Sequence, residues 1–319
     1  MKLSDTKRHP AQTVLIYGSP KTGKTQIVGD LSSHFKLVWV DLESGSTTLD
    51  KLPEEQKERI ELVNLPDTRS YPVAIETCLK IIKGGPAAIC DTHGKIDCAL
   101  CKKSGDTFTH VHFNMLGPDT IVVFDSLTQL TNSAIAHITK GQADDYKLNY
   151  DDWGNLGKLM DIFLSHVQQA KFNVICISHE TEVVMEDDKV RIVPTAGTRN
   201  FSRNTAKYFG HVIYCEVKNK KHVFTSSTTG TLSVVTGSRT GISIEGMKDA
   251  TLLPIFESNN RVRLESQESH SESSVFVGGV KLPLDDSKRT ENSLSNSQSD
   301  YSPGELAAKR LNLLAKLDK

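Results

Sequence analysis

The sequence predicts an α/β fold with a mostly parallel central sheet and helices on both faces. Over residues 1–257, short runs of aliphatic and β-branched residues alternate with longer helical patterns. Continuous apolar strands separated by helices are typical of a parallel sheet that is covered on both sides. The loop after the first apolar run reads YGSPKTGKTQ and leads directly into a helical pattern. In that setting a chain either simply turns or holds a phosphate.

The individual strands and helices follow from the periods of the apolar residues. Strands are expected at residues 14–17, 37–41, 60–63, 120–124, 173–178 and 211–216. Helices are expected between them, at residues 24–33, 73–83, 126–140 and 152–170. Residues 222–225 and 231–235, joined by SSTTG, are expected to form an antiparallel C-terminal hairpin, and residues 218–222 a hairpin turn.

Beyond residue 257 the composition changes. Residues 258–302 are rich in Ser, Asn, Gln, Glu and Asp, so we expect a flexible, solvated linker there. Residues 303–319 predict a short amphipathic helix, with Ser302 as its N-cap and Pro303 at its first position. The predicted organisation is one domain over residues 1–257, carrying an insertion at 84–119, followed by the linker and the helix.

Charge and cysteine count limit the class of protein. The net charge is −1 over 319 residues, so any basic surface must be local. Six cysteines, with no positively charged and then apolar leader at the start of the sequence, favour a reducing cytoplasm. No apolar run approaches the ~18 residues that cross a bilayer, and we expect no membrane partner.

The glycine-rich loop matches the phosphate-binding pattern G-x-x-x-x-G-K-[ST] at every required position. Backbone N–H groups that lead into a helix N-terminus favour an anion. In this interpretation Lys24 reaches the β- and γ-phosphates of ATP and the Thr25 hydroxyl binds Mg²⁺. The alternative is a turn rich in Gly and Thr. The expected ATP-binding residues are Gly18, Ser19, Pro20, Lys21, Thr22, Gly23, Lys24, Thr25 and Gln26.

Two acidic strand ends complete the expected nucleotide site. The run TIVVFDS ends in Asp125, placed like the Walker B carboxylate that holds Mg²⁺; a helix N-cap is the alternative there. The run LVWVDLE ends in Asp41 and Glu43, which point the same way if the strand continues. Glu43 is the expected base that orients the attacking water, unless it is a loop carboxylate in solvent.

These motifs, followed by the later strand end VICISHE, resemble in their order those of RecA-type ATPases. More narrowly, over about residues 10–245, the chain resembles the compact, phage-encoded RecA-like ATPases associated with single-strand annealing and recombination. The resemblance implies a RecA-like P-loop core, Mg²⁺-dependent ATP hydrolysis, single-stranded DNA binding and homo-oligomers with ATP at the protomer interface. It also implies contacts with single-strand-binding or other replication and recombination proteins, in the host cytoplasm if the chain is phage-encoded.

The polar pair after the fourth core strand is carried over from this resemblance. Ser178-His179 aligns with the pair that senses the γ-phosphate in the family. RecA itself has glutamine where this chain has His179, although histidine can also donate to a phosphate. A surface histidine after a strand is the alternative.

Two basic sites are also carried over. Arg199, Arg203 and Lys207 fall where the family's mobile DNA-binding loop lies, and their spacing of four puts them on one face if the segment is helical. A solvated helix face is the alternative. Arg239 lies in the segment TGSRTGI, which resembles the segment that reaches across the subunit interface. It is the candidate arginine finger supplied in trans, or else an exposed arginine beside a turn.

One cluster belongs to no RecA core. Cys90, His93, Cys98 and Cys101 are spaced C-x₂-H-x₄-C-x₂-C in a segment poor in apolar residues. Two closely spaced pairs of soft ligands suit a tetrahedral structural Zn²⁺, which would supply the folding energy of this segment. A redox role for Cys98 and Cys101, or a loop of reduced thiols, are the alternatives.

Two classes of function therefore stay open. In the first, the chain is a DNA-dependent ATPase that assembles on single strands and promotes annealing or recombination. In the second, the RecA-like core is a regulatory or motor ATPase that acts on a protein client, as a helicase loader does, and the near-neutral charge is compatible with this. A small-molecule kinase is a weaker third, because no segment has the pattern of an acceptor-binding lid.

Overall fold

The structure is a computed structural model that describes residues 11–184, 190–227, 233–244 and 251–257. Among these residues, the main element is an eight-stranded sheet in the order β11-β10-β1-β7-β6-β2-β3, with β12 paired to β10. Within this sheet, the neighbouring strands in the order β10-β1-β7-β6-β2-β3 are all parallel, whereas β10 pairs antiparallel with β11 and β12. The strands are β1 (Thr13–Gly18), β2 (Lys36–Asp41), β3 (Ile60–Asn64), β6 (Thr120–Asp125), β7 (Asn173–Ser178), β10 (His211–Lys218), β11 (Lys221–Thr225) and β12 (Gly237–Ser238).

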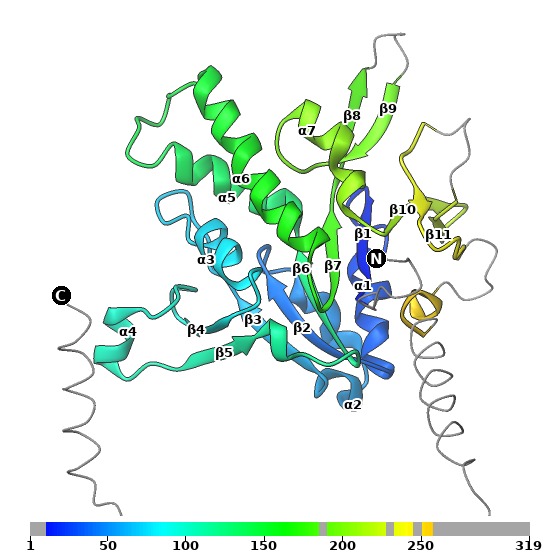
Figure 1. Cartoon of the computed structure of the whole chain (residues 1–319), viewed down its shortest axis with the longest axis horizontal. Coiled ribbons are helices and arrows are strands. Elements are labelled where there is room, and N and C mark those ends of the chain that lie inside the picture. The colour runs from blue at the N-terminus through cyan, green and yellow to red at the C-terminus, as the bar shows by residue number, and fades with distance from the viewer. Residues whose placement is uncertain (1–10, 185–189, 228–232, 245–250, 258–319) are drawn as a thin grey trace, which may run out of the picture. The chain divides into compact units, whose positions relative to one another are not determined.

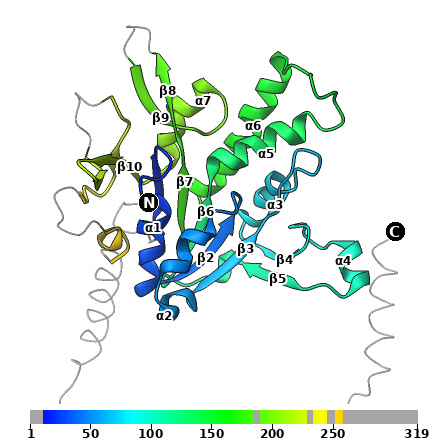
Figure 2. The same ribbon diagram turned by 180° about the vertical axis from the view of Figure 1, so that it is seen from behind.

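Both faces of the sheet are buried, because successive side chains of each central strand point to opposite faces and are apolar on both. In β1, Leu15 and Tyr17 belong to one core, whereas Val14 and Ile16 belong to the other. Figure 1 and Figure 2 show the helices that cover these cores from opposite sides. The first core includes residues of α3 (Ala74–Ile81), α5 (Leu127–Ile138) and α6 (Tyr150–Gln168), and the second includes residues of α1 (Lys24–Gly29), the 3₁₀ turns Asp30–Ser33 and Ser46–Lys51, and residues 251–257.

The predicted fold class is thus confirmed, and the six strands predicted for the parallel sheet agree with the observed ones to within one or two residues. The helix starts have local causes. Ser126 caps α5 by accepting a hydrogen bond from the Gln129 amide at 3.3 Å, and Asn149 and Asp152 form a reciprocal capping box at the start of α6. No helix among the described residues is long and apolar enough to cross a membrane.

An antiparallel C-terminal hairpin is present, but it pairs β11 with β10, whereas residues 222–225 were expected to pair with residues 231–235. β11 pairs with β10 through Asn219 and Lys220, both with positive φ (51° and 63°). This confirms the turn at 218–222, because two successive positive φ values suit the tight turn that matches strand twist. Residues 231–232 lie outside the described residues, and Val234 forms an isolated parallel bridge with Ile192 rather than a ladder with β11.

Two further hairpins were not predicted from the sequence (Figure 1). β8 (Glu180–Val184) and β9 (Val190–Pro194) follow β7 directly and lead to α7 (Arg199–Asn204). β4 (Pro86–Cys90) and β5 (Phe108–His112) flank α4 (Ala99–Ser104) within the insertion predicted at 84–119, while the short α2 (Glu54–Lys57) precedes β3. The linker at 258–302 and the helix at 303–319 lie outside the described residues, so the domain division stays a prediction.

Candidate functional site

The loop after β1 has the backbone and the charge of a phosphate-binding loop. Gly23 caps α1 in a left-handed conformation (φ 86°, ψ 11°), so the backbone enters the helix without a Cβ at that point. Lys24 is only 6% exposed and donates from Nζ to the carbonyl oxygens of Gly18 (2.9 Å) and Ser19 (2.7 Å). Burial lowers the pKa of Lys24. The ammonium is therefore held against the loop, beside the N-terminus of α1.

Close contacts with β10 and β11 hold the phosphate-binding loop in place. A Cβ on Gly18 would lie 2.0 Å from the carbonyl oxygen of Cys215 on β10, so only glycine fits there without a shift of the backbone. Thr22 Oγ1 donates to the Ser19 carbonyl oxygen at 2.8 Å, and the Thr22 carbonyl oxygen lies 3.0 Å from Nδ1 of His222 on β11. The contacts with Cys215 and His222 come from strands far away in sequence, which is why the motif alone could not reveal them.

For three of the predicted ATP-binding residues, the described structure shows no side-chain hydrogen bond to the loop. Pro20 and Lys21 are exposed. The Gln26 side chain donates along α1 to Asp30 at 2.7 Å. Their contribution to nucleotide binding stays a prediction.

Asp125 stands at the carboxyl end of β6, next to Thr25. The Thr25 hydroxyl donates to Asp125 Oδ2 at 3.3 Å. Asp125 is only 4% exposed, and burial, followed by the nearby charges of Glu43 and Asp41, raises its pKa to about 7. A buried carboxylate among other carboxylates favours a cation, and a carboxylate with a hydroxyl is a donor set that suits Mg²⁺.

The condition under which Asp41 and Glu43 would point the same way, a strand that continues past Asp41, is not met. β2 ends at Asp41, and the chain then turns. The Asp41 carboxylate accepts hydrogen bonds from the backbone amides of Glu43 (3.0 Å), Gly45 (3.2 Å) and Ser46 (3.2 Å). Asp41 therefore shapes the turn that presents Glu43.

Glu43 is held between two polar groups from other strands. The Ser126 hydroxyl donates to Glu43 Oε1, and His179 Nε2 lies 3.5 Å from the same oxygen. The contact with His179, helped by Ser126, keeps the pKa of Glu43 below its usual value, although partial burial opposes this. The predicted base and the predicted γ-phosphate sensor are thus brought together, with 29% and 31% of their side chains exposed.

His179 is fixed through its backbone. Its amide donates to Thr128 Oγ1 at 2.9 Å, and its carbonyl oxygen accepts from the amide of Thr195 at 2.8 Å. Nδ1 of His179 is buried and has no hydrogen-bond partner among the described residues. Ser178 Oγ bonds the carbonyl oxygens of His179 (2.9 Å) and Thr195 (2.8 Å), so this hydroxyl supports the strand exit.

Sequence reasoning missed Glu180. The Ser19 hydroxyl of the phosphate loop donates to Glu180 Oε1, and Glu180 Oε2 is buried without a partner among the described residues. Ser126 and Thr128, which bond Glu43 and His179, were also not assigned. Ser126 and Glu180 directly follow Asp125 and His179, and Thr128 lies three positions after Asp125. Their closeness to the motifs was a usable signal, but their hydrogen bonds join segments that are far apart in sequence.

These geometric findings agree with the sequence comparison. The family model for the AAA domain matches residues 11–240. This chain belongs to the AAA domain family. It is a P-loop, AAA-type ATPase, and ATP with Mg²⁺ is the ligand pair that such a domain implies. Lys24, Thr25 and Asp125 have the charges and donor atoms to hold that pair.

Comparisons of this AAA-domain chain with curated proteins and with solved structures give weaker similarities. No curated protein matches its sequence significantly. Among solved structures, it is similar to a KaiC-like protein from Pyrococcus horikoshii OT3, with 12% identity and a TM-score of 0.35 over 74% of this chain and 82% of that one. It is also similar to the flagellar accessory protein FlaH from Methanocaldococcus jannaschii, with 12% identity and a TM-score of 0.32 over 68% and 76% of the two chains. Likenesses at this level carry no functional argument.

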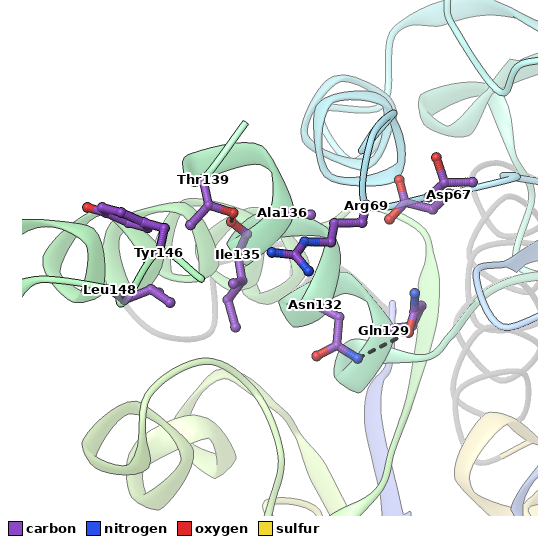
Figure 3. Close-up of a pocket in the computed structure, with 10 residues that line it drawn as sticks. Asp67, Arg69, Gln129, Asn132, Ile135, Ala136, Thr139, Tyr146 and Leu148 are labelled. Atoms are coloured by element: carbon purple, nitrogen blue, oxygen red, sulfur yellow. Dashed lines mark hydrogen bonds between the residues drawn. The ribbon is translucent and has the colours of Figure 1, made fainter. Parts of the chain in front are cut away.

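A groove leads from the Glu43–His179 pair of the AAA domain along α5. Two cavities of about 620 Å³ and 310 Å³ share four lining residues. The larger contains Glu43 and His179, and the smaller continues to Tyr146. Figure 3 shows Arg69 extending over the smaller cavity, with Tyr146 at its far end. The shared residues are Asp67, Thr68, Gln129 and Asn132.

The three basic residues predicted to contact DNA do not form one helical row. α7 ends at Asn204, and Lys207 lies in a following 3₁₀ turn with its ammonium 4.8 Å from the ring centroid of Tyr208. Arg203 Nη2 donates to the carbonyl oxygen of Val184 at the end of β8 (2.6 Å). Arg199 is exposed at the start of α7. The segment is thus attached to the β8–β9 hairpin.

Arg239 lies at the opposite end of the sheet from its own phosphate loop. Its amide donates to the Gly210 carbonyl oxygen (2.9 Å), and Nη2 donates to the Lys207 carbonyl oxygen (2.6 Å). Ser238 pairs with His211 at the start of β10, whereas Gly18 pairs with Cys215 farther along that strand. Arg239 therefore does not act on the nucleotide site of its own chain.

The predicted zinc ligands come together at the tip of the β4–β5 arm. The ligand atoms of Cys90, His93, Cys98 and Cys101 all lie within 4.8 Å of one another. His93 Nδ1 is 3.0 Å from Cys101 Sγ and 3.8 Å from Cys98 Sγ. A tetrahedral zinc site separates its donor atoms by roughly 3.6–3.8 Å, so the set is compatible with Zn²⁺. His110 and His112, also in this segment, are exposed.

The raised pKa of Asp125 predicts how stability depends on pH. Between about pH 4 and pH 7 the unfolded chain loses this proton while the folded chain keeps it, so the ionisation of Asp125 costs folding free energy as pH rises. Asp125→Asn removes this cost. We expect the variant to be more stable than the wild type by on the order of 2–4 kcal/mol at pH 8 and nearly equal to it at pH 4.

Urea denaturation of both proteins across this pH range, without nucleotide or Mg²⁺, measures the difference. Asp119→Asn, which removes an exposed carboxylate just before β6, is the matched control. A stability difference that does not grow from pH 4 to pH 7 would contradict the burial argument.

Proposed function

We propose that this ATPase hydrolyses ATP with Mg²⁺, binds single-stranded DNA, and assembles into oligomers that promote DNA annealing or recombination. This is the function of the phage-type RecA-like ATPases that the sequence resembles. The observation that carries the proposal is the meeting of Lys24, Thr25, Asp125, Glu43 and His179 at the carboxyl edge of one parallel sheet. That edge is where open α/β sheets bind their ligands.

Each of these side chains has a defined task in the proposal. Lys24 and the loop amides bind the phosphates, while Thr25 and Asp125 hold Mg²⁺. Glu43 orients the attacking water and accepts its proton, and Ser126 keeps the carboxylate in place. His179 contacts both Glu43 and the groove, so it can donate to the γ-phosphate without losing its fixed backbone. We further propose that Cys90, His93, Cys98 and Cys101 hold a structural Zn²⁺.

Replacing Glu43 tests the hydrolytic role. Glu43→Gln keeps an oxygen that can accept from Ser126 but removes the base, so ATP hydrolysis should fall about 10²- to 10⁴-fold while ATP affinity changes little. Steady-state turnover and calorimetric ATP binding measure the two effects. Glu61→Gln, an exposed carboxylate on β3, is the control. Retention of wild-type turnover would remove Glu43 from the mechanism.

DNA binding is supported by exposed cations on a segment joined to the nucleotide site. We expect Arg199→Ala with Lys207→Ala to weaken binding of a single-stranded oligonucleotide and to reduce the slope of log affinity against log salt by roughly 1–2 units, in the presence of an ATP analogue. Fluorescence anisotropy over a salt series measures both. Lys158→Ala with Lys171→Ala, two exposed lysines outside this segment, is the control; ATP turnover with and without the oligonucleotide tests DNA dependence.

Unchanged DNA binding in the Arg199/Lys207 double variant would contradict the DNA-binding assignment. Absence of DNA binding by the wild type would favour the second candidate, a motor or regulatory ATPase that acts on a protein client. One observation favours that candidate: Val184 and Val190, at the ends of the β8–β9 hairpin, are 58% and 46% exposed. Exposed aliphatic side chains at the far end of this hairpin suit a protein partner better than a phosphate backbone.

The position of Arg239 supports a role across a protomer interface, with ATP between the two subunits. Arg239→Ala and Lys24→Ala should each abolish most hydrolysis. Mixing the two inactive variants should restore turnover, because the arginine of one subunit then meets the intact phosphate loop of the other. Turnover is measured over mixing ratios, with oligomer size followed by light scattering. Mixed oligomers without restored turnover would contradict an arginine finger in trans.

A further inference from the structure

Residues 65–71 lie between the cysteine cluster and the catalytic groove. Leu65 and Pro66 line the larger cavity together with Leu42, Glu43 and His179. The Leu65 amide donates to the Asp41 carbonyl oxygen at 3.0 Å, which ties the start of the segment to the end of β2. The segment is therefore a wall of the groove next to the proposed base.

The opposite side of this wall contacts the turn that carries His93. A Cβ on Gly94 would lie 3.1 Å from Leu65 Cδ2 and 3.1 Å from Pro66 Cδ, so the turn is seated directly on these two residues. Gly94 has φ +63°, a conformation that favours glycine. Its carbonyl oxygen accepts a 2.7 Å hydrogen bond from Thr77 Oγ1 in α3. The turn is thus fixed between the wall and α3.

A second contact joins the other end of the segment to the same ligand. The rings of Tyr71 and His93 meet edge to face, with centroids 6.3 Å apart. Asp67 Oδ1 accepts from the amide of Ala74 at 3.0 Å and fixes the middle of the segment to α3. Both ends of the 65–71 segment therefore contact the His93–Gly94 turn, while Asp67 faces the groove.

The tip of the arm has little apolar material to hold this turn without a metal. Among the described residues, Cys90, Cys98 and Cys101 form a small cluster of their own, with Phe108 packed against it. A core of this size contributes little folding free energy, whereas a structural zinc site contributes folding energy directly. We therefore expect the metal to order the four ligand side chains, His93 among them, within a turn whose backbone is already bonded to α3.

We propose that metal binding at Cys90, His93, Cys98 and Cys101 positions residues 65–71, and so sets the shape of the groove beside Glu43. The inference rests on the proposed zinc site and on the proposed role of Glu43. The phosphate loop is framed by β10, β11 and α1, whereas the contacts of the arm described above are made with residues 65–71 and α3. Loss of metal therefore lowers kcat and leaves ATP affinity unchanged.

The first test removes zinc from the intact protein with a chelator and compares it with the zinc-loaded protein. Metal content is measured by atomic emission, and amide hydrogen exchange is measured by mass spectrometry. We expect one zinc per chain, and exchange in residues 65–71 that rises about tenfold on metal removal, as a local loss of order requires. Peptides from β6 serve as the internal reference that the sheet stays folded.

A pair of glycine variants separates the coupling from the metal site itself. Gly94→Ala places a Cβ against Leu65 and Pro66 but keeps all four ligands. Gly105→Ala, in the same arm, has an equally left-handed backbone (φ +78°) with nothing within 4 Å of the added Cβ. Both should bind zinc. Only Gly94→Ala should raise exchange at 65–71 and lower kcat several-fold, with the ATP dissociation constant changed by less than about twofold.

The outcomes are distinguishable. A wild-type chain that binds no zinc overturns the inference at its first step. Zinc binding with unchanged exchange at 65–71 after chelation overturns the coupling and leaves the metal site in place. Equal behaviour of the two glycine variants also overturns the coupling. Wild-type protein that binds ATP and zinc but does not hydrolyse ATP contradicts the proposed function instead, and the exchange measurement still decides the coupling.

Discussion

Three carboxylates meet at the carboxyl edge of the sheet, and the arrangement of the site depends on how each is satisfied. Asp41 accepts from three backbone amides. Glu43 has a hydroxyl and His179 beside it. Asp125 has the hydroxyl of Thr25 at 3.3 Å and is almost fully buried. Like charges in a buried site cannot all ionise without compensation. A divalent cation next to Asp125 would supply that compensation, which fits the Mg²⁺ that an AAA domain implies.

Much of the fold was predictable because it is local in origin. The central strands are continuous apolar runs, and the loop before Lys24 is a contiguous motif, so both can be found by reading along the chain. The features that were not predicted depend on hydrogen bonds and strand pairings that the apolar pattern does not reveal. The Asp41 carboxylate accepts hydrogen bonds from three backbone amides of the turn that follows β2. β11 pairs with β10 across the two-residue turn at Asn219–Lys220, whose positive φ values the apolar pattern does not reveal. Glu180 reaches Ser19 across 161 positions, and spacing carries no such information.

The residues that follow β7 contact both Glu43 and the phosphate loop, and they lead directly into the β8–β9 hairpin. His179 contacts Glu43, and the next residue, Glu180, contacts the phosphate loop. Thr195, just after β9, is bonded to the same exit, and Arg203 of α7 bonds the end of β8. A change at Glu43 or in the phosphate loop would therefore reach this hairpin. The hairpin is short and partly exposed, and such an element can shift at a small cost in free energy.

The β4–β5 arm shows how an insertion can influence a site without altering the sheet. Its base is fixed: the Asn114 amide donates to the Gly84 carbonyl oxygen at 2.8 Å, and Phe113 packs against Phe172 in the core with ring centroids 5.2 Å apart. A displacement at the tip therefore meets a rigid base on one side. On the other side it meets residues 65–71, of which 68–71 are exposed. We therefore expect residues 65–71, the wall of the groove, to move in response, rather than the β6 strand that carries Asp125.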